Sequence, residues 1–175
     1  MGLPIDRLGS GPRVRRAEDA VLPIGRSRSS AFKKHGGKLV MYTGWMDPVV
    51  PPQDTVAYYD AAVKVNGGLE KTREFYRLFM APGMGHCSGG PGPNQFDALT
   101  ALEQWVEKGV APEKLLASHS TNGKIDRTRP LCVYPQVARY KGTGSADEAA
   151  NFSCVTEAPS TPVRRSNTVG APSKP

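Results

Sequence analysis

The sequence has no run of about 18 apolar residues, which is the length that a membrane-spanning helix needs. Its first residues also lack the apolar core of a secretory signal peptide. We therefore expect no membrane partner and no signal peptide in this chain. Its 175 residues suffice for roughly one domain, or for part of a larger one.

Several motifs of metal and cofactor chemistry are also missing. The sequence contains no Cys-x-x-Cys pair, no Cys/His spacing typical of zinc sites, no glycine-rich phosphate loop and no pair of carboxylates at glycosidase-like spacing. We therefore expect neither a metal ion nor another cofactor in this chain.

Positive charge is abundant only at the two ends. Residues 1–34 hold 8 Lys and Arg against 3 acids, residues 35–157 hold 12 against 13, and residues 158–175 hold 3 against none. A nucleic-acid-binding domain carries its basic residues on the folded surface, whereas the middle of this chain is nearly neutral. We expect no nucleic-acid partner, and the alternative of a small basic nucleic-acid binder depends on the charged ends alone.

Cysteine is scarce, and with three residues at least one thiol has no partner within the chain. Cys132 and Cys154 bracket a loop-rich stretch, which favours a disulfide in an oxidising compartment and leaves Cys87 unpaired. Three reduced, buried thiols in a cytosolic protein remain the alternative.

The chain divides into three parts by composition. Residues 1–29 are rich in Gly, Pro, Arg and Ser without any hydrophobic period, and residues 158–175 are rich in Pro, Ser and Arg. We predict that both ends are disordered, that residues 1–29 are foreign to the fold, and that residues 30–157 form the domain.

The middle of the chain alternates predicted strands and helices. Short apolar runs and their Pro, Asn and Gly boundaries predict strands at residues 38–43, 74–80 and 114–118, and helices at residues 51–66 and 94–108. This order is typical of an α/β fold, in which helices flank a sheet of parallel strands.

The second predicted helix carries a specific expectation about its start and its packing. Asn94 is the expected N-cap, because its side chain can accept a hydrogen bond from the first turn. The apolar stripe expected to face the sheet consists of Phe96, Leu99, Leu102 and Val106.

Asp47 and His86 each follow a predicted strand, where parallel sheets gather functional groups. A carboxylate that accepts a hydrogen bond from one imidazole nitrogen fixes the tautomer and leaves the other nitrogen free to take a proton from a hydroxyl. The order of carboxylate before histidine is that of α/β-hydrolases. We predict that Asp47 orients His86 and that His86 is the general acid and base; a turn aspartate and a loop histidine without a function remain the alternatives.

The surroundings of this pair are less informative. Glycines around His86 would let the chain turn and a substrate approach, although a flexible surface loop would have them too. Trp45 and Met46 either line a pocket or simply pack. His35 and His119 stand in no comparable context, and we expect them to be ordinary surface or core residues.

A nucleophile is not evident. No Gly-x-Ser-x-Gly elbow occurs, and the nearest imitation, at Ser10, is followed by Pro12 and preceded by no strand. Ser88 lies in the histidine loop itself and is a poor candidate. We predict no nucleophile in this chain, and an aspartate and a histidine without one would be inactive.

Three segments together resemble the C-terminal part of the tannase and feruloyl esterase family. They are residues 44–52, 80–87 and 129–135, with the sequences GWMDPVVPP, MAPGMGHC and RPLCVYP. The likeness runs from about residue 30 to residue 155. It implies a fragment of an α/β-hydrolase fold from a serine carboxylic ester hydrolase, usually secreted, whose small-molecule substrates are phenolic acid esters such as feruloyl or galloyl esters.

The resemblance also assigns residues. It places the family's catalytic aspartate and histidine at Asp47 and His86, and a disulfide between Cys132 and Cys154. It implies that the partner of Cys87 is a cysteine beside the nucleophilic serine, in an upstream part that also supplies the oxyanion hole and a calcium-holding lid. None of these is in this chain, so we expect a fragment that is inactive alone. The alternative is a non-catalytic module that binds phenolic esters or a partner chain through an exposed half-sheet.

Overall fold

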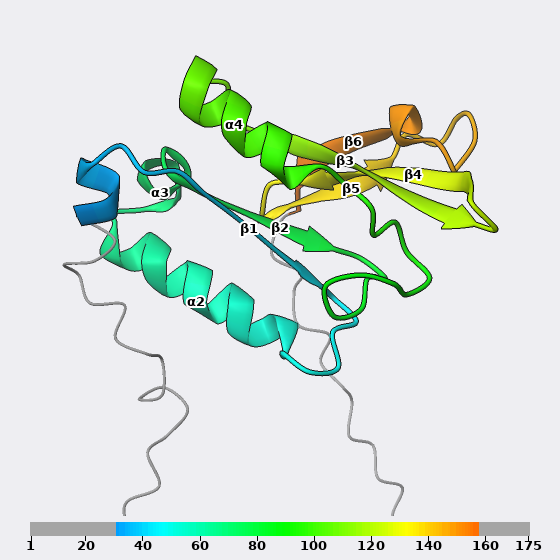
Figure 1. Cartoon of the computed structure of the whole chain (residues 1–175), viewed down its shortest axis with the longest axis horizontal. Helices are drawn as coiled ribbons and strands as arrows, with labels where there is room; N and C mark the ends of the chain where they lie inside the picture. Colours follow the sequence, from blue (N-terminus) through cyan, green and yellow to red (C-terminus); the bar gives the residue numbers. More distant parts are fainter. Residues whose placement is uncertain (1–30, 158–175) are drawn as a thin grey trace, which may run out of the picture.

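The computed structural model describes residues 31–157, and the predictions of disorder at residues 1–29 and 158–175 lie outside this range. Figure 1 shows the arrangement of the elements. The strands are β1 (Leu39–Gly44), β2 (Tyr76–Ala81), β3 (Lys114–Thr121), β4 (Lys124–Cys132), β5 (Gln136–Tyr140) and β6 (Phe152–Thr156). The helices are α2 (Pro52–Val65), α3 (Leu69–Arg73) and α4 (Ala98–Lys108), with a 3-10 turn, η2, at Ala149–Asn151.

A parallel pair of strands, β1 and β2, lies between α2 on one face and α4 on the other (Figure 1). Every residue of β2 is buried, as expected for a strand covered on both faces. Successive side chains of a strand point to opposite faces. Tyr76, Leu78 and Met80 therefore pack with α2, while Phe79 and Ala81 pack with residues of β3 and β4.

The third predicted strand is present, but its predicted parallel orientation is wrong. β3 pairs with β4 in an antiparallel hairpin. The turn between them contains Asn122 and Gly123, whose φ angles of 51° and 77° are those of a tight two-residue hairpin turn. The chain therefore reverses directly at Gly123, and β3 pairs with the strand that follows it instead of joining β1 and β2.

The start and the buried face of α4 also differ from the predictions. Asp97, rather than Asn94, caps the helix by accepting a hydrogen bond from the Thr100 N–H at 2.8 Å. The backbone N–H of Asn94 donates to the Ser118 carbonyl at 3.0 Å, which ties this residue to β3 instead.

Only part of the predicted apolar stripe of α4 faces the core. Leu99 and Val106 are 66% and 61% exposed. Trp105 is buried, and Ala98 and Ala101 contact the core in their place. The spacing of these three residues also matches one helical face, and the small alanines let the helix approach closely.

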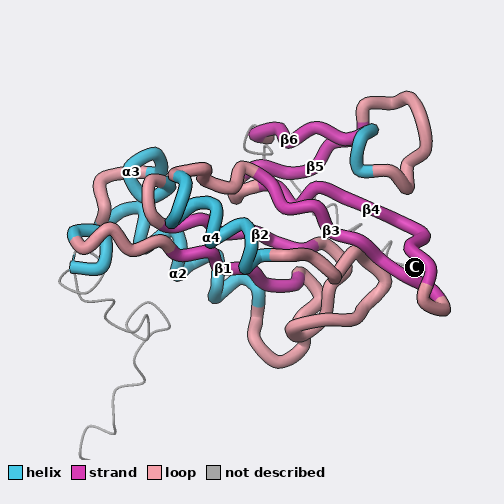
Figure 2. Tube along the Cα trace, turned by 45° about the horizontal axis from the view of Figure 1, so that its top comes forward, coloured by secondary structure: helices cyan, strands magenta, loops and turns pink. Residues whose placement is uncertain are grey.

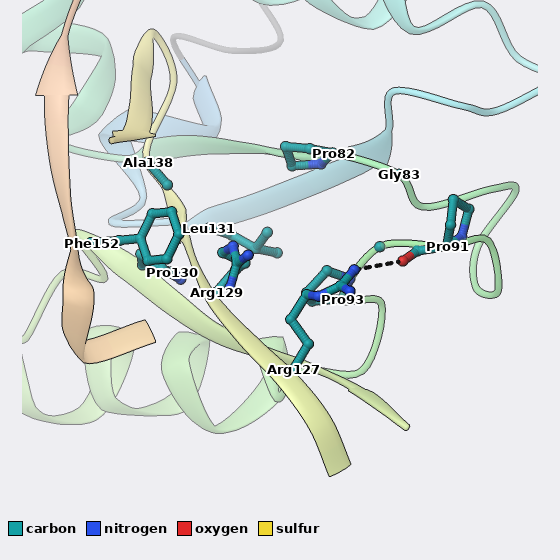
Figure 3. A pocket seen from close by; sticks show the side chains of 11 residues that line it. Pro82, Gly83, Pro91, Pro93, Arg127, Arg129, Pro130, Leu131, Ala138 and Phe152 are labelled. Atoms are coloured by element: carbon teal, nitrogen blue, oxygen red, sulfur yellow. Dashed lines mark hydrogen bonds between the residues drawn. The ribbon is translucent and has the colours of Figure 1, made fainter. Parts of the chain in front are cut away.

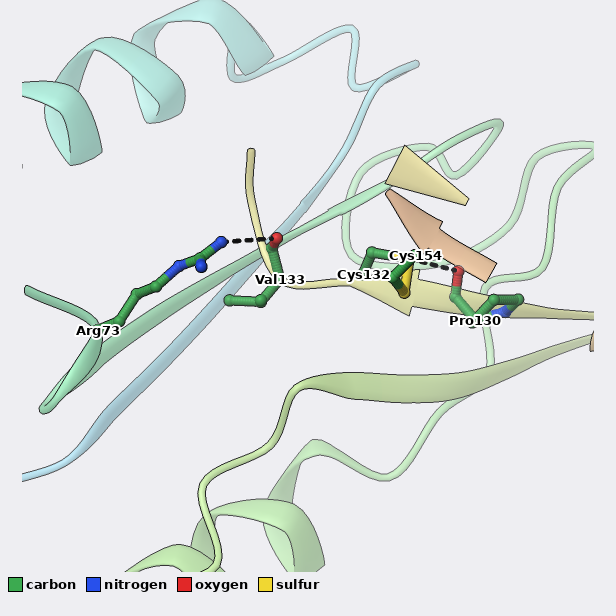
Figure 4. The surroundings of a disulfide bond; sticks show 5 residues. All are labelled: Arg73, Pro130, Cys132, Val133 and Cys154. Carbon is green, nitrogen blue, oxygen red and sulfur yellow. Dashed lines mark hydrogen bonds between the residues drawn. A yellow bond between two sulfur atoms is a disulfide. The ribbon is translucent and has the colours of Figure 1, made fainter. Parts of the chain in front are cut away.

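The C-terminal strands form a second antiparallel hairpin, β5 and β6, which the sequence did not predict. A disulfide between Cys132 and Cys154, with a Cα–Cα distance of 5.6 Å, joins β4 to β6 (Figure 4). Arg73 donates to the Tyr134 carbonyl at 2.9 Å and so links the end of α3 to the segment after β4. Within residues 31–157, no helix is both long and apolar enough to cross a membrane.

Candidate active site

The loops that follow β1 and β2 lie at the same end of the parallel pair (Figures 1 and 2), because the strands run in register from Leu39 and Tyr76 to Gly44 and Ala81. Backbone hydrogen bonds hold the two loops together. The Met46 N–H donates to the Met84 carbonyl at 3.0 Å. The β1 loop carries Asp47 and the β2 loop carries His86.

Asp47 uses its two carboxylate oxygens differently. Oδ1 accepts hydrogen bonds from the backbone N–H groups of Val49 at 2.8 Å and Val50 at 2.9 Å. Oδ2 lies 2.8 Å from Nδ1 of His86. The first oxygen therefore closes the turn that leads into α2, and the second holds the imidazole.

The environment of the carboxylate favours its charged form. The Val50 N–H, and also the contact with His86, lower the pKa of Asp47 below its ordinary value, although burial acts in the opposite direction. The Asp47 side chain is only 4% exposed, whereas that of His86 is 46% exposed. The aspartate is thus enclosed and ionised, while the imidazole reaches the surface.

The predicted contact is present: the side chains of Asp47 and His86 lie within hydrogen-bond reach of each other. Because Nδ1 of His86 faces an acceptor, it carries the proton in the neutral ring, and Nε2 is left with a free lone pair. Such an imidazole can accept a proton from a hydroxyl and return it to a leaving group.

A cavity of about 230 Å³ adjoins the pair. Met41, Thr55, Met84 and Cys87 contribute to its walls. Trp45 and Met46 do not, and they are 42% and 55% exposed. Of the two alternatives considered for these residues, the structure supports neither pocket lining nor tight packing.

Cys87 follows the histidine in an exposed position, and it has no disulfide partner among the described residues. Its φ angle is 62°, in the left-handed region that residues other than glycine rarely adopt. The loop is closed by a hydrogen bond from the Gly85 N–H to the Gly89 carbonyl at 3.0 Å. Cys87 thus lies in a tight, closed turn directly after the histidine.

A second aspartate–histidine contact occurs in the β3–β4 hairpin. Nδ1 of His119 lies 2.6 Å from Oδ1 of Asp126, whose other oxygen accepts from the Thr121 hydroxyl. Hydrogen bonds from Thr121 and His119 lower the pKa of Asp126. This contact was not predicted from the sequence; the Asn122-Gly123 turn, which pairs the residues on either side of it, was the signal that could have revealed it.

The described residues contain no cluster of side chains typical of a metal site. In the range that the structure describes, no group of three or more His, Cys, Asp or Glu side chains could hold a metal. Calcium requires several oxygen ligands around one point. The calcium ion that the resemblance implies for an upstream lid stays an expectation about sequence outside this chain.

Comparison with known proteins decides the family. Residues 19–155 match the family model described as "Tannase and feruloyl esterase". The chain belongs to the tannase and feruloyl esterase family. The match begins at residue 19, whereas the resemblance predicted a start at about residue 30.

Two curated relatives are much longer than this chain. An uncharacterized esterase from Xanthomonas campestris pv. campestris is 42% identical over an alignment of 156 positions, and the match covers 72% of this chain and 27% of the relative. The mono(2-hydroxyethyl) terephthalate hydrolase of Piscinibacter sakaiensis is 46% identical over 128 residues, which cover 71% of this chain and 21% of the relative. The chain thus spans about a quarter of the length of these relatives.

A solved structure agrees with this family assignment. The crystal structure of an esterase from Aspergillus oryzae superposes with a TM-score of 0.68 at 37% identity, over 72% of this chain and 29% of that one. The disulfide expected from the family resemblance is present between Cys132 and Cys154.

Proposed function

We propose that this chain forms the C-terminal part of a serine carboxylic ester hydrolase with an α/β-hydrolase fold, acting on phenolic acid esters such as feruloyl or galloyl esters. The observation that carries this proposal is the 2.8 Å contact between Asp47 Oδ2 and His86 Nδ1 at the carboxyl ends of two parallel strands. Family membership and the esterase and hydrolase names of the relatives support it.

In the proposed mechanism His86 moves protons and Asp47 positions it. Nε2 of His86 takes the proton of a serine hydroxyl as that oxygen attacks the ester carbonyl, and then returns the proton to the departing alcohol. Asp47 keeps the proton on Nδ1 and stabilises the imidazolium that forms. Water repeats the cycle on the acyl-enzyme with the same proton transfers.

The serine is proposed to come from sequence that this chain does not contain. Among the described residues, no hydroxyl is hydrogen-bonded to the histidine of the pair, whose contact is with Asp47. Acyl transfer requires the nucleophile itself, because a general base acts only by taking the proton of the attacking hydroxyl. The residues of this chain would then supply the acid–base half of a site shared with an upstream segment.

We also propose that the whole protein is secreted. The disulfide between Cys132 and Cys154 supports this, because structural disulfides persist in oxidising compartments and are rare in the cytosol.

A chimera tests the proposed function. Residues 19–155 of this chain would replace the matching segment of the Piscinibacter sakaiensis hydrolase, which provides the upstream sequence. The chimera should hydrolyse mono(2-hydroxyethyl) terephthalate and methyl ferulate. Replacing His86 by alanine should lower kcat by at least about 1,000-fold, because a triad loses most of its rate when one member is removed.

The chain offers a matched control for that substitution. His119 also bonds an aspartate through Nδ1, so His119→Ala removes an equivalent side chain and contact from the hairpin. This variant should retain the activity of the chimera. If the folded chimera is inactive, or if His86→Ala retains full activity, the proposed role of His86 is wrong.

A binding module is the second candidate, and one observation favours it. Tyr42 on β1, Leu99 on α4 and Leu116 on β3 are 44%, 66% and 65% exposed. These large apolar side chains are accessible for contact with another polypeptide. Tight binding of methyl ferulate by the isolated chain, together with a folded but inactive chimera, would favour this candidate over the esterase.

A further inference from the structure

A second cavity, of about 450 Å³, lies beneath the loop that carries His86. It shares no lining residue with the smaller cavity beside the Asp47–His86 pair. Its walls come from the two ends of the histidine loop and from β4, β5 and β6 (Figure 3). The volume falls within the range of about 300–1,000 Å³ that is typical of small-molecule sites.

Most of the wall is apolar and flat. Pro91 and Pro93 line one side, Leu131 lines the floor, and Phe152 with Ala138 closes the opposite side (Figure 3). Leu131 is only 1% exposed and belongs to the main core cluster. The floor is therefore fixed by core packing, and flat walls of this kind suit a planar ring.

Two arginines bring positive charge into the cavity. Arg127 and Arg129 lie two residues apart on β4, so both side chains stand on the same face of the strand. Arg127 is neutralised by Asp147, whose Oδ1 lies 3.0 Å from its Nε, and it also donates to the Pro91 carbonyl at 3.3 Å.

Arg129 is not neutralised in this way. Its guanidinium lies 4.2 Å from the centre of the Phe152 ring, and Nη1 donates to the Thr128 carbonyl at 2.7 Å. No carboxylate within residues 31–157 forms a salt bridge with it. Burial and the charge of Arg127 lower the pKa of Arg129, whereas the charge of Asp147 acts in the opposite direction.

We propose that this cavity binds a small aryl carboxylate, with the carboxylate on the Arg129 guanidinium and the ring between the prolines and Phe152. A guanidinium and a carboxylate are complementary in shape and charge, and they can form two parallel hydrogen bonds. An inorganic phosphate would satisfy the charge but would leave the apolar walls in contact with water. A guanidinium that forms no salt bridge with the described residues, together with apolar walls, therefore favours an aromatic acid.

The position of the cavity links its occupant to the histidine loop. Pro82 and Gly83 precede His86, whereas Pro91 and Gly92 follow it, and all four line the cavity. The Gly92 N–H donates to the Gly83 carbonyl at 3.0 Å, closing the neck of the loop. Aryl carboxylates are also the acid products of the proposed esterase reaction; this connection depends on the proposed function, whereas binding in the cavity does not.

Calorimetry with the full 175-residue chain tests the proposal. The probe is trans-cinnamate, compared with trans-cinnamamide, which has the same shape without the charge, and with inorganic phosphate. We expect cinnamate to bind with a dissociation constant of about 0.1–1 mM, and the amide at least about tenfold more weakly. Arg129→Gln should weaken cinnamate binding by about tenfold, the effect of losing one charge-assisted hydrogen-bonded pair.

Two control variants isolate the cavity. Arg139→Gln removes one positive charge from an exposed side chain that does not line the cavity, so it should leave cinnamate binding unchanged. His86→Ala should also leave it unchanged, which separates this site from the proposed catalytic one. Amide chemical shifts of Gly92 and Leu131 in the unaltered chain locate the ligand without relying on any variant.

Each outcome supports or overturns the proposal. Cinnamate binding that shifts Gly92 and Leu131 and weakens in Arg129→Gln supports it. No binding at about 10 mM, equal binding of the amide, preference for phosphate, or binding lost in His86→Ala but not in Arg129→Gln overturns it. The experiment measures binding and not catalysis. Its results therefore test the cavity even if the proposed esterase function is wrong.

Discussion

Gly44 lies so close to the carbonyl oxygen of Met84 that a Cβ atom on the glycine would come within 2.1 Å of it. This contact brings the end of β1 against the start of the histidine loop. Asp47 and His86 lie three and two residues beyond these contact points, and their side chains meet there.

We predict that Gly44→Ala destabilises the fold and separates the pair. The obstructing atom belongs to the backbone and cannot rotate away, so the loop must move, at a cost of about 1–3 kcal/mol or more. Gly109→Ala is the control, because nothing lies within 4 Å of its Cβ position and only its left-handed φ of 72° is strained. Urea unfolding should show a larger loss for Gly44→Ala; an equal or smaller loss would mean that the loops adjust freely.

The isolated chain should not hydrolyse methyl ferulate, methyl gallate or p-nitrophenyl acetate faster than its His86→Ala variant does. The pair is formed, but an acid–base residue without a nucleophile has no hydroxyl to activate. Initial rates at several protein concentrations would measure this. Turnover that disappears specifically on His86→Ala would reveal a nucleophile within the chain, with Ser88 the first to replace.

Reduction of the disulfide should lower the free energy of unfolding by about 3 kcal/mol. Cys132 and Cys154 are separated by 22 residues, and a bridge across a loop of this length restricts the unfolded chain by about that amount. Cys132→Ala with Cys154→Ala should match the reduced protein, whereas Cys87→Ser should change little because Cys87 is exposed and unbridged in the described range. Peptide mapping without reduction checks the connectivity, and a bridge to Cys87 would contradict it.

The stability that Asp47 contributes should depend on pH with a definite sign. Its pKa is lowered in the folded protein, chiefly by the Val50 N–H, so the unfolded state binds more protons as the carboxyl titrates. The contribution is therefore present above the ordinary carboxyl pKa of about 4 and is lost as pH falls through the lower folded pKa. The difference in unfolding free energy between the wild type and Asp47→Asn should shrink below about pH 4; a constant difference would show that the charge is irrelevant.

The first half of the domain could be predicted from local patterns. Short apolar runs identified β1 and β2, and the Pro51-Pro52 pair marked the start of α2, because these signals depend on residues close together in sequence. The meeting of Asp47 and His86 followed from one further rule, that parallel strands end at the same edge of a sheet.

The second half could not be predicted in the same way, for two different reasons. The β3–β4 hairpin had a local signal, Asn122-Gly123, that was not used. The arginine-lined cavity had none, since Arg129 meets Phe152 only after β4 and β6 come together through the fold. Likewise, Asp97 and Asn94 are both good N-caps, and the bond from Asn94 to Ser118 decides between them.

One oxygen of the Asp47 carboxylate holds the turn into α2 and the other holds His86, so replacing one oxygen by nitrogen separates the two roles. In Asp47→Asn, the remaining side-chain oxygen can still accept the N–H groups of Val49 and Val50, so the turn into α2 is preserved. The new amide nitrogen would face Nδ1 of His86 as a donor, which forces the imidazole proton onto Nε2. Nε2, the atom that should receive a proton in the reaction, would then already carry one. The nitrogen-15 chemical shifts of the His86 ring would show this change of tautomer in a protein whose fold is unchanged.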